Sequence, residues 1–109
     1  MMGQERIFLL TNFAVYNVKA DQIDRKINIS SVKAVTISTK SGCAQIVIHV
    51  RSEFDYLIES EQRREMLDAL KWTWFHAHSE NLPIYGVPAK LNDYHTSKKD
   101  IANGLEVNP

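Results

Sequence analysis

The residue types that perform catalysis or bind metals are sparse in this chain, and the histidines illustrate this well. His76 and His78 are two positions apart, which on a helix directs their side chains about 200° from each other. Histidines that share a metal ion on a helix stand at i and i+3 or i+4 instead. Both residues suit the last turn of a helix, where a positive charge interacts favourably with the helix dipole. We therefore expect no metal site.

Other candidate catalytic residues also lack partners at the required spacing. His49 lies in a strand-like segment with no Ser or carboxylate at a catalytic spacing. Cys43 follows Gly42, and no cluster of cations stands beside it in the sequence to lower the pKa of the thiol. Glu61 and Glu65 share a helix face, where they suit a solvated first turn. We therefore expect no catalytic residues, no cofactor and no enzymatic activity.

Basic residues are the better candidates for a binding function. They occur in or near the loops and outer faces of the second to fourth strand-like segments, at Lys19, Arg25, Lys26, Lys33 and Lys40. If these loops share one rim, they form a positive surface that attracts anionic ligands. The alternative is scattered solubilising charge, which the acidic neighbours Asp21 and Asp24 favour.

Two aromatic residues offer a second candidate surface. Trp74 belongs to the apolar stripe of a predicted helix, whereas Trp72 points about 160° away from it and Phe75 lies between them on the helical wheel. An exposed Trp is a common anchor of protein interfaces. The alternative, which we favour, is that the apolar segment 81–87 covers Trp72 with Ile84 or Tyr85. We expect this segment to fold back onto the domain or to add an edge strand.

Six short segments with alternating apolar residues must position these side chains. Alternation with a period of two and many β-branched residues is typical of half-buried strands. Asn12, which tolerates left-handed backbone angles, predicts a tight hairpin between the first two. The predicted strands are residues 6–11, 13–18, 25–29, 32–38, 44–50 and 54–58.

A single amphipathic helix is predicted directly after the strands, over residues 61–78 and capped by Ser60. Its stripe contains Arg63, Met66, Leu67, Leu70, Trp74 and Ala77. We expect this stripe to cover the opening of a curved sheet, where Leu67, Leu70 and Trp74 pack against Ile27, Ile29, Ile46 and Ile48.

The order of these segments resembles the class I myosin tail homology domain, a branch of the pleckstrin-homology-like superfold. The resemblance rests on RIFLLTNFAVYNV, INISSVKAVTIS, IVIHV, FDYLIES and RREMLDAL, and it extends from Glu5 to about His78. It implies a mainly β (α+β) fold, a bent antiparallel sheet or open barrel of six or seven strands capped by one C-terminal helix. It also implies binding to anionic phospholipids, often phosphoinositides. The further strand and basic stretch that the family usually has before "LLT" are absent or reduced here, and we expect the chain to be part of a larger protein.

Composition restricts the remaining function classes. Thirteen acidic and thirteen basic residues give zero net charge, which disfavours a nucleic-acid partner. A single Cys excludes an internal disulfide and fits a reducing compartment. No apolar run approaches the roughly 20 residues that a transmembrane helix requires. We expect a cytoplasmic protein that is peripheral at a membrane or at the cytoskeleton.

These observations predict one domain at residues 5–87 and a flexible tail or linker at residues 88–109, where prolines and glycines accumulate. The first hypothesis for its function is a non-catalytic membrane-targeting module that binds anionic phospholipids or phosphoinositides through the five basic residues. The alternative is a protein-interaction or scaffolding module of the same fold, with Trp72 and Phe75 at the interface.

Overall fold

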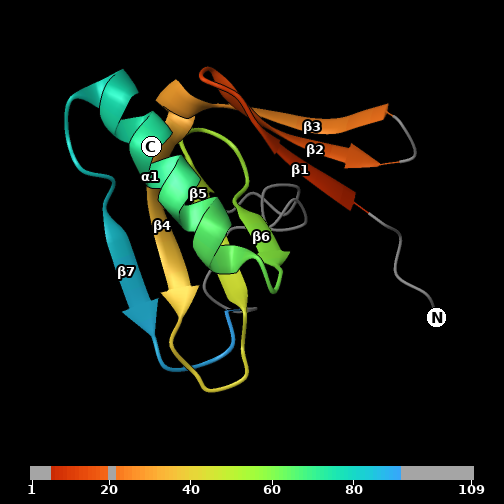
Figure 1. Ribbon diagram of the computed structural model, residues 1–109, viewed down its shortest axis with the longest axis vertical. Coiled ribbons are helices and arrows are strands. Elements are labelled where there is room, and N and C mark those ends of the chain that lie inside the picture. The colour runs from red at the N-terminus through yellow and green to blue at the C-terminus, as the bar shows by residue number, and fades with distance from the viewer. Residues whose placement is uncertain (1–5, 20–21, 92–109) are drawn as a thin grey trace.

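The fold consists of two sheets and one long helix (Figure 1), in a computed structural model that describes residues 6–19 and 22–91. The first sheet is an antiparallel meander of β1 (Arg6–Leu10), β2 (Ala14–Lys19) and β3 (Gln22–Asn28). Thr11 closes the predicted β1–β2 hairpin, because its backbone N–H donates to the Ala14 carbonyl at 2.9 Å and its hydroxyl accepts the Ala14 N–H at 3.1 Å. The hairpin tip is thereby fixed without any contribution from the side chain of Phe13.

A short 3₁₀ turn, η1 (Ile29–Ser31), leads into the second sheet, whose strand order is β6-β5-β4-β7. β4 (Val32–Ser38), β5 (Gln45–Val50) and β6 (Tyr56–Glu59) are antiparallel neighbours. β7 (Ile84–Val87) pairs with β4 in parallel, at the far edge of the sheet. The parallel pairing is possible because α1 (Arg63–His78) returns the chain across the sheet before β7 begins (Figure 1).

The core lies between α1 and the two sheets. Leu70 and Trp74 are buried in one cluster with Ile27, Ile29, Ile46 and Ile48, and Leu67 packs partly buried against it, as the stripe predicted. The indole N–H of Trp74 donates to the Val32 carbonyl at 2.7 Å, so the ring fills space and also satisfies a buried acceptor. Full burial of an Ile or Leu side chain contributes about 1.5–3 kcal/mol each.

The other face of the second sheet is also covered, which explains why β5 is buried along almost its entire length. Val47 points away from the α1 side and is fully buried. The segment after β7 covers this face, because the Leu91 N–H donates to Gln45 Oε1 at 2.7 Å and the Ser38 hydroxyl donates to the Ala89 carbonyl at 2.6 Å. The predicted domain boundary at Val87 stays a prediction, and residues 92–109 of the predicted tail lie outside the described residues.

The N-terminus of α1 is fixed by a side chain. Arg63 Nη1 donates to the carbonyl oxygens of Ser38, Cys43 and Gln45 at 2.7, 3.2 and 3.0 Å, which ties the helix to the β4–β5 hairpin. The helix begins two residues later than predicted, and the hydroxyl of Ser60 accepts the Gln62 N–H in the turn before it. None of the described helices is both long enough and apolar enough to span a bilayer.

The predicted fold class is confirmed, with seven strands and one C-terminal α-helix among residues 6–19 and 22–91. One packing prediction was wrong. Segment 81–87 adds an edge strand, as expected, but it does not cover Trp72. β7 pairs with β4, and Leu82, just before β7, enters the core, which leaves Trp72 60 % exposed. Ala77, expected on the buried stripe, is exposed as well.

Candidate lipid- and partner-binding surfaces

The five basic residues singled out in the sequence are distributed over both sheets. Lys19 ends β2, and Arg25 and Lys26 are neighbours on β3. Lys33 lies half-buried on β4, and Lys40 lies exposed in the β4–β5 turn. This turn is at the bottom of Figure 1, whereas β2 ends at the right of the view, so the five positions do not share one rim.

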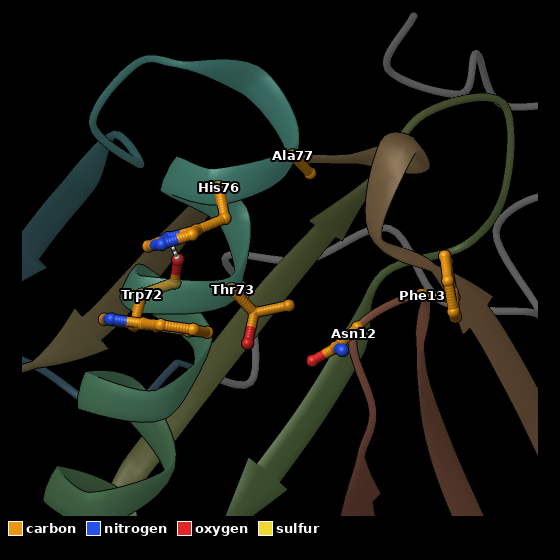
Figure 2. Close-up of a pocket in the computed structure, with 6 residues that line it drawn as sticks. All are labelled: Asn12, Phe13, Trp72, Thr73, His76 and Ala77. Atoms are coloured by element: carbon orange, nitrogen blue, oxygen red, sulfur yellow. Dashed lines mark hydrogen bonds between the residues drawn. The ribbon is translucent and has the colours of Figure 1, made fainter.

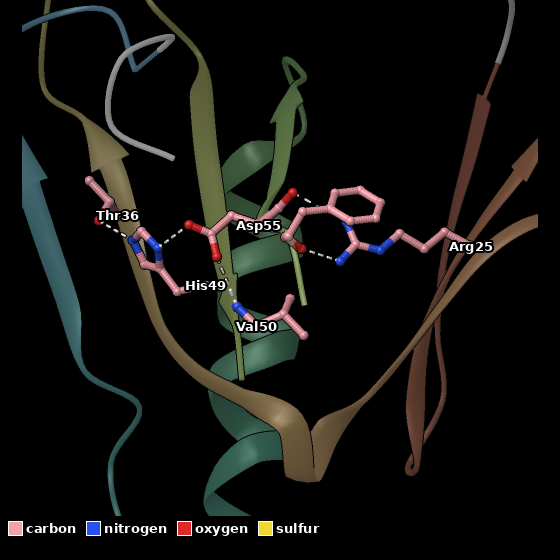
Figure 3. Close-up of polar contacts among 6 residues, drawn as sticks. Arg25, Thr36, His49, Val50 and Asp55 are labelled. Carbon is pink, nitrogen blue, oxygen red and sulfur yellow. Dashed lines mark hydrogen bonds and ion pairs between the residues drawn. The ribbon is translucent and has the colours of Figure 1, made fainter. Parts of the chain in front are cut away.

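Arg25 is turned into the molecule. Its guanidinium donates to the carbonyl oxygen of Phe54 and, at 3.2 Å, to that of Asp55, and it stacks on the Phe54 ring at 3.8 Å from the centroid (Figure 3). Glu53 lies 3.9 Å away. Burial lowers the pKa of Arg25, and attraction to Glu53, Tyr56 and Asp55 offsets part of that shift. The side chain therefore joins β3 to the loop before β6 and is engaged by protein atoms.

Lys26 has the opposite orientation, because neighbouring residues of a strand face opposite sides of the sheet. Leu9 pairs with Tyr16 and Tyr16 pairs with Lys26, so these three side chains cross one face of the sheet in a row. Lys26 Nζ lies 6.0 Å from the centroid of the Tyr16 ring. Val18 and Ile23 form the next row on the same face, because an irregularity after Asn17 shifts the register of β3 by one residue.

This outer face of β1–β3, composed of Leu9, Tyr16, Val18, Ile23 and Lys26, is apolar and only partly covered. Leu9 is 48 % exposed and Ile23 is 63 % exposed. Lys19 pairs with Gln22 at the end of the sheet where Ile23 lies. This face was not among the predicted surfaces. The alternation that identifies the inward residues of β1 and β2 also identifies their outward residues and would have indicated it.

A second surface lies between α1 and the tip of the β1–β2 hairpin. A groove of about 400 Å³ is lined by Asn12, Phe13, Trp72, Thr73, His76 and Ala77. Figure 2 draws these six side chains. Phe13 is 81 % exposed, and the rings of Trp72 and His76 stack with centroids 3.9 Å apart. The Nδ1–H of His76 donates to the Trp72 carbonyl at 3.0 Å, which holds the imidazole against the indole. Phe75 is exposed next to this groove on α1, so both predicted interface aromatics are at the surface.

A buried polar chain on β4 and β5 has the residue types of a catalytic triad. His49 Nδ1 lies 2.9 Å from Asp55 Oδ2, and His49 Nε2 lies 2.7 Å from the Thr36 hydroxyl (Figure 3). Asp55 Oδ1 also accepts the Val50 N–H at 3.1 Å. Thr36 is only 6 % exposed and borders neither of the two cavities described here. These hydrogen bonds therefore hold the β5–β6 loop from one side, and Arg25 holds it from the other.

Cys43 lies at a small polar cavity of about 420 Å³ that Gly42, Gln45, Glu59 and Lys90 also line. A hydrogen bond involving Ser38 lowers the pKa of the Cys43 thiol, and bonding to Gln45 and the charge of Arg63 contribute to the shift. These partners come from β4, β5 and α1, which is why the local sequence around Cys43 did not indicate them. Among residues 6–19 and 22–91, no three His, Cys, Asp or Glu side chains gather as a metal site would require.

The described residues have a fold of the pleckstrin-homology-like kind, with two sheets and one C-terminal helix. Residues 2–87 match the model of a family described as the unconventional myosin tail, actin- and lipid-binding. Because the match covers most of the chain, the protein belongs to this family, which confirms the resemblance seen in the sequence. No curated protein matches the chain.

Proposed function

We propose that this chain is a non-catalytic membrane-targeting domain that binds anionic phospholipids, phosphoinositides included, through the outer face of β1–β3. Membership of a family described as lipid-binding supports the ligand class. The observation that carries the choice of surface is that exposed Leu9 and Ile23 lie in two adjacent rows on the same face of a sheet as Lys26. Such a face offers apolar side chains to the acyl region and an ammonium group to the headgroups.

The expected affinity is weak. Each lysine near an anionic membrane surface contributes about 1 kcal/mol, an effect that salt screens. Insertion of a partly exposed side chain such as Ile23 adds about 1–2 kcal/mol. Of the five basic residues, Lys26 lies on this face. Lys19 alternates to the other side of the sheet, but it ends β2 beside the Val18–Ile23 pair, and we assign it together with Lys26 to the membrane contact. Arg25 is engaged in the interior, and Lys33 and Lys40 belong to the other sheet and its turn.

Vesicle co-sedimentation tests this proposal with three vesicle types: neutral phosphatidylcholine, the same with phosphatidylserine, and the same with a phosphoinositide. We expect binding to both anionic types at low salt and a marked loss in the doubly substituted Lys19→Glu/Lys26→Glu protein. Lys40→Glu is the matched control, because this exposed lysine in the β4–β5 turn carries the same charge at a different place.

The replacement Ile23→Asp separates apolar insertion from charge, since it leaves both lysines in place. This variant should bind anionic vesicles more weakly than the parent. Its melting temperature should stay close to that of the parent, because Ile23 is exposed. If the unsubstituted protein ignores anionic vesicles at low salt, the lipid proposal fails. If Lys40→Glu weakens binding as much as the double substitution, the assigned surface is wrong.

A further inference from the structure

The outer face of the second sheet, on the side away from α1, is buried along its length. Its side chains alternate with the core-facing side chains of β4 and β5, and they belong to Ala34, Thr36, Ser38, Gln45, Val47 and His49. All of these residues are buried except His49, which is largely buried. The strands of a sheet are buried on both faces only where a second layer of chain lies on each face. This face therefore has a cover of its own.

Residues 88–91 form one end of this cover. The Ser38 hydroxyl donates to the Ala89 carbonyl, and the Leu91 N–H donates to Gln45 Oε1. Because Ser38 ends β4 and Gln45 begins β5, both hydrogen bonds lie at the same end of the face. The opposite end lies four residues further along β5, about 13 Å away. Residues 88–91 cross the strands at one end, so another segment covers the rest.

Leu91 shows that the cover continues along the chain. Its side chain and backbone together have no exposed surface, although Leu91 lies outside the sheet. A residue in such an outer layer is completely buried only where further chain lies over it. Thr36 and Asp55 are buried as well, in the polar chain that they form with His49 further along the face (Figure 3). The residues that directly follow Leu91 are the nearest segment that can cover both places.

We propose that residues 92–97 dock on the outer face of the second sheet and run along β5 toward His49. Asn92 and Asp93 have side chains that favour turns. A turn directly after Leu91 redirects the chain, which crosses from β4 to β5 there, into the direction of the strands. Six residues span at most about 20 Å, which suffices to reach the opposite end of the face.

Tyr94 is the side chain that we assign to the centre of this contact, over the Thr36–Val47 pair. It is the first large apolar residue after Leu91. The face beneath it is mixed, because Val47 is apolar whereas Thr36 and His49 are polar. A tyrosine suits such a surface, since its ring packs on apolar atoms and its hydroxyl forms a hydrogen bond. The second sheet thus binds part of the chain's own C-terminal segment, and the domain extends past the end of β7.

Hydrogen exchange of the full chain, followed by NMR, tests the proposal. We expect the amides of residues 92–97 to exchange at least about tenfold more slowly than those of an unstructured chain. Tyr94→Ala should remove this protection and lower the melting temperature by about 5 °C or more. Leu105→Ala is the matched control, because it removes an apolar side chain of the same C-terminal segment beyond the length that the face requires. Its exchange and melting temperature should equal those of the parent.

Vesicle binding keeps this proposal separate from the lipid-binding one. Tyr94→Ala should bind anionic vesicles like the parent, because the outer face of β1–β3 belongs to the other sheet. Lys26→Glu should leave the exchange of residues 92–97 unchanged for the same reason.

Three results would overturn the inference. The first is exchange of residues 92–97 at the rate of an unstructured chain in the parent. The second is a melting temperature of Tyr94→Ala equal to that of Leu105→Ala. The third is protection that disappears on dilution, which would assign the cover of this face to a second copy of the chain.

Discussion

At the residue scale, two neighbours on one strand show how similar charges serve different purposes. Arg25 and Lys26 are both cationic residues on β3, yet Arg25 is half-buried and stacks on Phe54, whereas Lys26 is exposed beside Tyr16. The planar guanidinium stacks on a ring and reaches two carbonyl oxygens at once. An ammonium group is more strongly hydrated and is better suited to the surface. Alternation separates the two residues in the sequence, but it does not state which one points inward.

Arg25→Ala should therefore destabilise the fold. The sequence alone suggested instead that Arg25 contacts a ligand. The substitution leaves the Phe54 and Asp55 carbonyls without their donor and removes the stacking on Phe54. We expect a loss of about 2–4 kcal/mol in the free energy of unfolding, measured by urea denaturation. Lys26→Ala is the control and should change this free energy by about 0.5 kcal/mol or less. Equal stability of both variants would refute the assigned role of Arg25.

At the element scale, α1 and β7 show how far the sequence pattern reaches. The alternation of β4 and β5 and the helical stripe at Leu70 and Trp74 were sufficient to predict the sheet, the helix and much of their contact, because side-chain period follows from backbone geometry. The position of β7 was not predictable in the same way, since its pairing with β4 joins residues far apart in the chain. The sequence shows that segment 81–87 is apolar, but it does not show which strand or helix this segment packs against. The exposure of Trp72 follows from that choice.

The indole of Trp74 is expected to be the strongest single anchor between α1 and the sheets. Trp74→Ala should cost roughly 3–5 kcal/mol of unfolding free energy, because it removes a buried ring and leaves a cavity. Trp74→Phe should cost about 1–3 kcal/mol, because it keeps most of the packing but leaves the Val32 carbonyl without the indole donor. Chemical denaturation followed by circular dichroism gives both values. Trp72→Ala is the matched control two residues away and should be close to neutral; a comparable loss there would contradict the assigned burial.

β7 should show protection from hydrogen exchange that depends on its pairing with β4. The Val35 N–H donates to the Pro83 carbonyl and the Thr39 N–H donates to the Val87 carbonyl, both on the β7 side of β4. We expect these two amides to exchange slowly in the parent and faster in Leu82→Ala, which loosens the segment that leads into β7. Exchange of both amides at the rate of an unstructured chain in the parent would contradict the parallel pairing.

At the scale of the whole molecule, the two exposed apolar surfaces differ in charge. The outer face of β1–β3 combines Leu9 and Ile23 with Lys26, whereas no Asp, Glu, Lys or Arg is among the described residues that line the groove beside α1. Zero net charge of the whole chain therefore conceals a local difference between its surfaces. Most of the residues involved could be identified from the sequence, but this division could not, because it depends on which strands share a sheet.

Because one copy of the chain binds a membrane weakly, joining two copies should increase the vesicle affinity strongly. If each copy has only about two lysines and a few apolar side chains at the bilayer, fusing the chain to a dimeric coiled coil should raise vesicle affinity about a hundredfold or more. Co-sedimentation with anionic vesicles measures this gain. A fusion that carries Lys19→Glu and Lys26→Glu in both copies is the control. An unchanged affinity of the unsubstituted dimer would show that the single chain does not contact the vesicle through the outer face of β1–β3.

The contrast between the two tryptophans has a practical consequence. They are the only two indoles in the chain, and α1 exposes one by 60 % and the other by 5 %. Each also stacks on the histidine four residues later, with centroids 3.9 Å apart for Trp72–His76 and 4.0 Å apart for Trp74–His78. The protein thus contains two intrinsic fluorophores in different solvent environments. Emission at the red edge should report the groove, emission at the blue edge should report the core, and an ionic quencher should extinguish the first before the second.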